Sequence, residues 1–276
     1  MEGFKPRTYY VLLVAVLGLG ALLHLSALAT LPPGLHSDEA FHMLRALDIV
    51  NGVDLPRYIT GNQGNEPLMA YLSAVIIAIV GPVPWASRLV SAFASLIALA
   101  ATVRLGREMA PRRSVGLAAG LLWCTLGWAL TVGRLGTQPM LSVAAAAAAM
   151  AGLWSGLRGG RLSSFAWGGL ALGFGLDSYV AFRLFPLVPL VTWVACWWTA
   201  PRERRPLLVR GGLTFVGVAA LTYAPVASFF VQHPEWFFNR FNQVTDSTIQ
   251  TVGAASNMLD GLWRSVGGLF WAGDVM

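Results

Sequence analysis

Four ionisable side chains stand within seven residues, directly after the first long apolar run of the chain. The stretch LPPGLHSDEAFHML, residues 31–44, contains His36, Asp38, Glu39 and His42. Pro-Pro-Gly ends the apolar run, and Ser37 or Asp38 can cap a new helix there. An acid at the amino terminus of a helix lies near the positive end of its dipole and stays ionised. This position suits Asp38 as a general base, with Glu39 as its support.

The same stretch allows two other interpretations. Asp38 can serve only as a helix cap, or the cluster can bind a metal. Glu39 and His42 have the spacing of a di-iron bundle ligand pair, but no second Glu-x-x-His occurs and the HExxH motif is absent. A weakly held divalent cation that bridges a phosphate to Asp38 or Glu39 fits better, because hard cations bind carboxylate and phosphate oxygens.

Further polar residues stand at the ends of later apolar runs: Glu66, Arg134, Asp177, Tyr179, Arg183 and Arg240. Ionisable groups at the edge of a membrane bundle are costly unless they are paired, hydrated or used. A guanidinium group can bind a phosphate through two hydrogen bonds, so Arg134, Arg183 and Arg240 are candidate phosphate ligands. Each of them alone could equally extend to lipid headgroups. Together with the acids, they favour a lipid-phosphate substrate that meets a catalytic carboxylate.

The composition is that of a multi-pass membrane protein. Of the 276 residues, 56% are hydrophobic and 12% are charged, and the mean hydropathy is +0.62. Two cysteines, both in apolar stretches, exclude a disulfide scaffold. The pI of 9.9 arises from short basic clusters between apolar runs, which is typical of membrane-protein loops and gives no indication of a nucleic-acid partner.

Seven apolar runs approach the roughly 20 residues that a spanning helix needs. They cover residues 9–31, 86–107, 114–133, 138–156, 164–182, 184–200 and 211–231. An eighth run, 66–83, is ambiguous. If it lies along the outer surface and does not cross, 12 of the 19 Lys and Arg residues face the cytoplasm, as the positive-inside rule requires. We therefore predict seven spans, a cytoplasmic amino terminus and an interfacial helix within 66–83.

This topology places the candidate site in a long first outer loop, residues 32–85. Apolar residues at helical spacing after Glu39 predict a second helix on the membrane surface. The spacings Gly116/Gly120 and Gly169/Gly173 predict close helix packing through small residues. The whole chain, 1–276, is expected to form one transmembrane domain.

Several short motifs, in order, resemble the GT-C glycosyltransferases, in the branch of protein O-mannosyltransferases and aminoarabinose transferases. The motifs are LHSDEA at 35–40, NEPLxxYL at 65–72, RLVSA at 88–92, GFGLxxYxxFRxxP at 173–186, and AP at 224–225 through HPExxxxRxxQV at 233–244. The resemblance covers nearly the whole chain. Asp177 departs from it, since bacterial relatives usually have an uncharged or aromatic residue there. Relatives are about twice as long, so the chain is expected to correspond to their amino-terminal half.

The resemblance implies an inverting transferase that takes a sugar from a polyprenyl-phosphate carrier at the outer face of the plasma membrane. The catalytic base of the family falls on Asp38, and Glu66 and Tyr179 become candidates for contact with the sugar or the acceptor. The acceptor would be a protein, lipid or glycan. No cofactor is implied with certainty, although a divalent cation at Asp38 and Glu39 stays open.

Two other functions fit the same sequence. A transporter or flippase for a lipid-linked sugar would show interrupted spans and polar residues near the membrane midplane. Here His24 is the one ionisable residue well inside a predicted span. The second alternative is an accessory subunit that lacks catalysis and assists another transferase.

Overall fold

The computed structural model describes residues 6–110 and 112–239, and every named element in these ranges is a helix. The α-helices are α1 (Pro6–Leu25), α2 (Ser37–Val50), α3 (Leu68–Val80), α4 (Ala86–Met109), α5 (Ser114–Thr125), α6 (Gly127–Arg134), α7 (Pro139–Gly159), α8 (Leu162–Leu176), α9 (Leu187–Thr199) and α10 (Arg205–Gln232). Two 3₁₀ helices are η1 (Val180–Leu184) and η2 (Arg202–Arg204). The prediction of an all-α membrane protein is confirmed.

The chain forms two compact units, residues 1–229 and 230–276. In the described part of the second unit, the rings of Phe230 and Phe237 meet edge to face at 5.4 Å. All of the candidate residues described below belong to the first unit.

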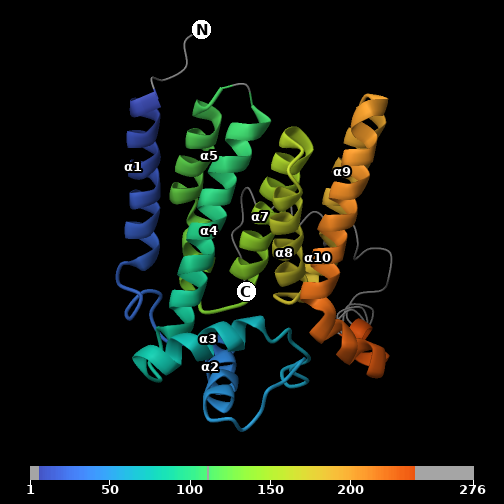
Figure 1. The fold of residues 1–276 in the computed structure, drawn as a ribbon. Helices are drawn as coiled ribbons and strands as arrows, with labels where there is room; N and C mark the ends of the chain where they lie inside the picture. The colour runs from blue at the N-terminus through green and yellow to red at the C-terminus, as the bar shows by residue number, and fades with distance from the viewer. Residues whose placement is uncertain (1–5, 111, 240–276) are drawn as a thin grey trace, which may run out of the picture. The chain divides into compact units, whose positions relative to one another are not determined.

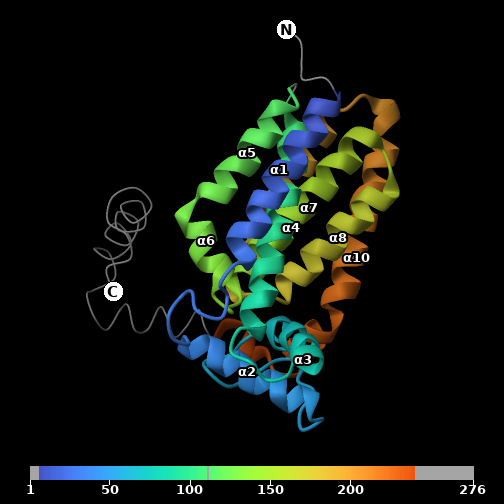
Figure 2. The same ribbon diagram turned by 90° about the vertical axis from the view of Figure 1, so that its left-hand side faces the viewer.

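Helix α4 is the centre of the first unit. It contacts α1, α2, α3, α5, α6 and α7. Half of the residues in its most apolar stretch are buried, compared with 17% in the corresponding stretch of α1. Its buried face consists mainly of alanine and serine, which allow neighbouring helices to approach closely. Figures 1 and 2 show the long helices side by side around it.

The predicted close packing through glycine is confirmed. A Cβ atom at Gly116 would collide with the carbonyl oxygen of Val103 on α4, and one at Gly169 with the carbonyl of Phe215 on α10. These backbones approach so closely that only glycine fits at either position.

Helices α2 and α3 lie next to each other across one end of the long helices (Figures 1 and 2). α3 has 13 residues, too few to cross a bilayer of about 30 Å. This arrangement agrees with the prediction that 66–83 does not span. Arg134, Asp177 and Arg183 are on segments that end at the same side of the bundle as α2 and α3 (Figure 1).

Three of the predicted spans differ from the structure. The first, predicted to reach Leu31, ends at Leu25. Ala27 then has a left-handed backbone conformation (φ 54°), and the carbonyl of Leu28 accepts a hydrogen bond from Arg88 in place of a helical one. The run 114–133 is broken into α5 and α6, which meet at a bend of 63°. At the break, the hydroxyl of Thr125 donates to the carbonyl of Leu121, and Gly127 follows; both features favour a kink.

Five helical segments in the described ranges are long and apolar enough to span a membrane, and a sixth qualifies if α5 and α6 count as one. The third span that differs, 164–182, is shorter than predicted: α8 ends at Leu176 after 15 residues, or about 22 Å. The predicted count of seven is therefore approximate, although all seven predicted runs are helical and the chain is a multi-pass membrane protein.

Candidate active site

The amino terminus of α2 is capped by His36, not by Ser37 or Asp38 as predicted from the sequence. The backbone amide of Asp38 donates to Nδ1 of His36 at 3.2 Å. In return, the backbone amide of His36 donates to Oε2 of Glu39 at 2.9 Å. An unprotonated imidazole nitrogen can accept this bond as a hydroxyl or carboxylate oxygen would, so the serine and the aspartate are left for other contacts.

Glu39 forms a buried ion pair with Arg88 of α4. The side-chain exposures are 0% for Glu39 and 3% for Arg88. Arg88 Nε donates to Glu39 Oε1 at 2.9 Å, and Nη2 donates to Oε2 at 3.1 Å. The backbone amide of Gly136 is a third donor to the carboxylate and contacts Oε1 at 2.7 Å. With His36, these donors fill the roughly four acceptor positions of a carboxylate.

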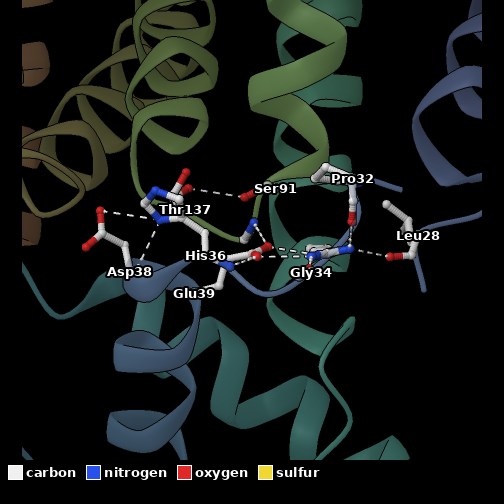
Figure 3. A network of polar contacts seen from close by, with 10 residues as sticks. Leu28, Pro32, Gly34, His36, Asp38, Glu39, Ser91 and Thr137 are labelled. Atoms are coloured by element: carbon white, nitrogen blue, oxygen red, sulfur yellow. Dashed lines mark hydrogen bonds and ion pairs between the residues drawn. The ribbon is translucent and has the colours of Figure 1, made fainter. Parts of the chain in front are cut away.

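Arg88 also organises the segment between α1 and α2. Its two Nη atoms donate to the backbone carbonyls of Leu28 at 3.1 Å, Pro32 at 2.8 Å, and Gly34 (Figure 3). All five N–H groups of the guanidinium are thereby used. Although burial alone would raise it, the hydrogen bonds from Arg88, Gly136 and His36 hold the pKa of Glu39 below its usual value. Glu39 is thus an ionised structural anchor.

Asp38 is the acid of the pair that remains open. Its side chain is 49% exposed, and its Oδ2 lies 3.9 Å from Nδ1 of His36 (Figure 3). The side-chain amide of Asn62 donates to Oδ1 of Asp38 at 3.3 Å. Asn62 is at the tip of a turn that the backbone pairing of Ile59 with Asn65 closes. One carboxylate oxygen of Asp38 is therefore oriented by an amide, while the group as a whole stays accessible.

His42 lies one turn after Asp38 and is buried, with 2% of its surface exposed. Burial lowers the pKa of His42 to about 4, although the nearby Asp38 carboxylate opposes this. The imidazole is therefore neutral at physiological pH and places no cation beside Asp38.

A second carboxylate–arginine pair joins the beginning of α3 to η1. Glu66 is 1% exposed, and its Oε1 accepts a hydrogen bond from Arg183 Nη2 at 2.8 Å. Burial raises the pKa of Glu66, and Arg183 opposes this effect. Burial and the Glu66 charge also raise the pKa of Asp177, to about 7. The structure thus brings the predicted residues Glu66 and Arg183 together, with Asp177 close enough to interact with Glu66.

The other predicted residues have different surroundings. Arg134 donates to the carbonyls of Leu23 at 2.6 Å and Ser26 at 2.5 Å, so its guanidinium caps the carboxyl end of α1. Tyr179 is half-buried and immediately precedes η1. Arg240 lies outside the described residues.

The loop between α6 and α7 connects the two pairs. Gly136 donates to Glu39, and two residues later the side-chain amide of Gln138 donates to the backbone carbonyl of Glu66 at 3.0 Å. Between them, the carbonyl of Thr137 accepts a hydrogen bond from Ser91 of α4 at 3.1 Å (Figure 3). One short loop thus contacts both Glu39 and Glu66, and the loop is itself bonded to α4.

Residues 64–229 match the family model for dolichyl-phosphate-mannose-protein mannosyltransferase. The chain belongs to this family. The match includes Glu66, Arg88 and Arg183 of the mannosyltransferase-family chain, and it begins after Asp38.

Solved structures of an oligosaccharyltransferase have the same fold as this mannosyltransferase-family chain. The archaeal enzyme AglB from Archaeoglobus fulgidus, in complex with an inhibitory peptide and a dolichol-phosphate, superposes with a TM-score of 0.61 at 16% identity, over 98% of this chain and 38% of AglB. The apo form of the Archaeoglobus fulgidus oligosaccharyltransferase gives a TM-score of 0.62 at 15% identity, over 97% of this chain and 37% of that enzyme. The chain therefore spans less than half of these proteins. No curated protein sequence matches it.

Sequence reasoning missed Arg88, Gly136 and Asn62 as site residues of this mannosyltransferase-family chain. Arg88 offered a signal, because an arginine near the start of an otherwise apolar span has to find a partner. Neither Gly136 nor Asn62 differs in sequence from an ordinary loop residue, and only the fold shows their contacts with the acids.

The expected cation site finds limited support in the geometry. Among the residues that the structure describes, no group of three His, Cys, Asp or Glu side chains is placed to hold a metal ion. Both oxygens of Glu39 already accept hydrogen bonds from nitrogen donors. Of the two acids, Asp38 is the one whose carboxylate is accessible to solvent. It could contact a cation that arrives with a substrate phosphate.

Proposed function

We propose that the chain is a glycosyltransferase core that moves a sugar from a polyprenyl-phosphate carrier to an acceptor hydroxyl. The family match supports the transferase activity, and the AglB complex, which contains a dolichol-phosphate and an inhibitory peptide, supports a lipid-phosphate carrier. The observation that carries the catalytic assignment is the contrast within the acid pair at the start of α2. Glu39 is saturated with donors, whereas Asp38 is half exposed at the same helix terminus.

In the proposed reaction, Asp38 accepts the proton of the acceptor hydroxyl as its oxygen attacks the anomeric carbon. The bond from this carbon to the phosphate oxygen breaks, and the lipid phosphate leaves with the electron pair. Attack from the face opposite the phosphate inverts the anomeric centre. The hydrogen bond from Asn62 orients one oxygen of the Asp38 carboxylate, and the ionised carboxylate is the form that a base requires.

Positive charge for the departing phosphate would come from Arg183 and from Arg240. The role of Arg240 is proposed from the sequence alone. Arg134 is a weaker candidate, because its guanidinium is engaged by the carbonyls at the end of α1. Glu66 pairs with Arg183, and Tyr179 precedes the 3₁₀ helix that contains Arg183; we assign both to contacts with the sugar or the acceptor.

The proposed orientation places α2 and α3 at the outer face of the plasma membrane. The opposite end of the bundle supports it, since a cavity there of about 700 Å³ is lined by Arg104, Arg107, Arg113, Arg158 and Arg161. A basic end of this kind is expected on the cytoplasmic side.

A transporter of lipid-linked sugars is the second candidate, and the bend between α5 and α6 is the observation that favours it. Transport sites are expected near the membrane midplane, at such breaks. The charged pairs of this chain lie instead at the α2–α3 end, and the transferase accounts for their position better.

The test of the proposal is sugar transfer in membranes that contain the wild-type chain, Asp38→Asn or Asp48→Asn. Asp48 is the matched control, since it lies on the same helix but pairs with Arg45 at 3.1 Å, away from the acid pair. We expect transfer from radiolabelled polyprenyl-phosphate sugars to fall about 10²-fold or more in Asp38→Asn and to persist in Asp48→Asn. Full activity of Asp38→Asn would reject the base. Absence of transfer by the wild type with every donor would favour the accessory-subunit alternative.

A further inference from the structure

Two buried polar atoms near the Glu66–Arg183 pair have no hydrogen-bond partner among the described residues. They are Oδ1 of Asp177, which follows the last residue of α8, and the hydroxyl of Tyr223 on α10. More than nine in ten buried polar groups in proteins are hydrogen-bonded, and exceptions often mark a site for an absent molecule. Here two such atoms come from neighbouring helices, since Gly173 of α8 lies against Thr222 of α10.

The charges around these atoms define which ligand they can accept. Asp177 interacts electrostatically with Glu66, and Tyr223 interacts with Arg183, Glu66 and Asp177. The Arg183 guanidinium donates to Glu66, and among the described residues no ion pair joins a cation to Asp177. The unpartnered oxygen of Asp177 can accept a hydrogen bond from a sugar hydroxyl, and the Tyr223 hydroxyl can donate to or accept from a second sugar oxygen.

An apolar cavity of about 620 Å³ ends at the same place. Leu176, Pro186 and Tyr223 are among its lining residues, and Leu176 directly precedes Asp177. The remaining lining side chains come from α7 to α10 and are apolar, apart from the indole nitrogen of Trp193, which donates to the carbonyl of Leu208. A second cavity, of about 380 Å³ between α3, α4, α7 and α8, has an entirely apolar lining. The larger cavity is thus lined by Tyr223 and by the residue that precedes Asp177.

From these observations we infer that Asp177 and Tyr223 form a sugar-recognition subsite, with the apolar cavity holding the lipid chain of the same molecule. One sugar hydroxyl donates to Oδ1 of Asp177, and the Tyr223 hydroxyl bonds to a second sugar oxygen. The inference rests on the proposed function, because it takes the lipid-linked sugar as its ligand. It assigns to this pair the selection of the sugar, a role separate from proton transfer by Asp38.

The test is equilibrium binding to the 276-residue chain in lipid nanodiscs, without acceptor. The probes are polyprenyl-phosphate mannose and polyprenyl phosphate of the same chain length. Removal of one hydrogen bond in a desolvated site should weaken mannose-lipid binding about tenfold in Asp177→Ala and in Tyr223→Phe. Binding of the sugar-free lipid should change by less than about twofold. Asp177→Asn should bind the mannose lipid nearly as well as the wild type, since its amide oxygen can accept the same hydroxyl.

The matched control is Ser178→Ala. Ser178 is next to Asp177 and fully buried, but its hydroxyl donates to the carbonyl of Gly175 at 2.6 Å, so its removal should leave both affinities unchanged. Unchanged mannose-lipid binding in both Asp177→Ala and Tyr223→Phe would show that the two atoms hold water only. Equal weakening of both probes would assign the pair to lipid binding or to folding. Either result overturns the subsite and leaves Asp38 as base untouched, whereas a wild-type chain that binds neither probe rejects the proposed function as well.

Discussion

Glu39 and Glu66 are both buried beside an arginine at the same end of the helices, but their hydrogen bonding differs. Glu39 receives donors from Arg88, Gly136 and His36 on both oxygens, and the five N–H groups of Arg88 all have acceptors. Among the described residues, the side chain of Glu66 accepts one hydrogen bond, from Arg183 at 2.8 Å, and nearby Asp177 has an unpartnered oxygen. The first pair is complete without a ligand, and the second leaves polar atoms for one.

This difference separates structural from functional charge in the molecule. A buried ion pair stabilises a fold only when further hydrogen bonds satisfy both partners. The pair of Glu39 meets this condition and fixes the start of α2, so that Asp38 is held in place. The Glu66–Arg183 pair leaves a buried oxygen of the Asp177 carboxyl without a partner, and ionising this group in the folded protein costs free energy. Carboxyl groups perturbed in this way are typical of sites that bind a substrate.

The largest effect is expected for Arg88→Met. The substitution leaves Glu39 as an uncompensated buried charge and should lower the free energy of unfolding by about 3–5 kcal/mol. Thermal unfolding in detergent measures it. Arg104→Met is the control, because Arg104 pairs with Glu108 but is 55% exposed, and its loss should cost at most about 1 kcal/mol. Equal destabilisation by the two variants would contradict the structural role of Arg88.

A smaller effect is expected for Gly136→Ala. An added Cβ would collide with the hydroxyl of Ser87 and lie 2.9 Å from the backbone nitrogen of Arg88. It should therefore displace the amide that donates to Glu39 and cost about 1–3 kcal/mol of stability. Combining Gly136→Ala with Ser87→Gly should recover part of the loss; if it recovers none, steric crowding by Ser87 is not the cause.

The stability of the region around the Glu66–Arg183 pair should depend on pH through Asp177. The folded-state pKa of Asp177, about 7, is above its ordinary value of 3.8, so the folded protein holds this proton more tightly than the unfolded chain. The contribution of Asp177 to stability is therefore complete below about pH 4 and is lost as the pH rises through about 7. Asp177→Asn should remove this dependence and raise the melting temperature at pH 8, relative to the wild type, by about 2–4 °C. At pH 4 the wild type and Asp177→Asn should have the same melting temperature.

If the melting temperatures of the wild type and Asp177→Asn differ by the same amount at pH 4 and pH 8, Asp177 does not titrate between these values. The proposed burial of an uncompensated carboxylate would then be incorrect.

The smallest effect on stability is expected for Asp38→Asn. The side chain is half exposed, and an asparagine can still accept the hydrogen bond from Asn62, so the free energy of unfolding should change by less than about 0.5 kcal/mol. The same variant is expected to lose transfer. A large loss of stability would mean that Asp38 is structural and that the activity test reports folding.

Much of the fold could be predicted from the sequence, because hydrophobicity and charge act over short stretches of chain. The apolar runs predicted the helices, and the distribution of Lys and Arg predicted that 66–83 does not cross. The break at Leu126 and the early end of α1 could not be predicted in this way. Both depend on hydrogen bonds or local geometry that compete with the helix. After α1, the competing hydrogen bond to the carbonyl of Leu28 comes from Arg88, 60 residues further along the chain.

The sequence by itself determined that ionisable residues gather at the ends of the apolar runs, since membrane insertion tolerates them only there. The tertiary structure decided which of them are paired. It joined Glu39 to Arg88 across 49 residues and Glu66 to Arg183 across 117, and it bound Arg134 to the end of α1. Such pairings depend on which helices become neighbours. The free energy of a buried charge is set by those neighbours, so the sequence can show where charges concentrate, and only the packed helices show which carboxylate remains available.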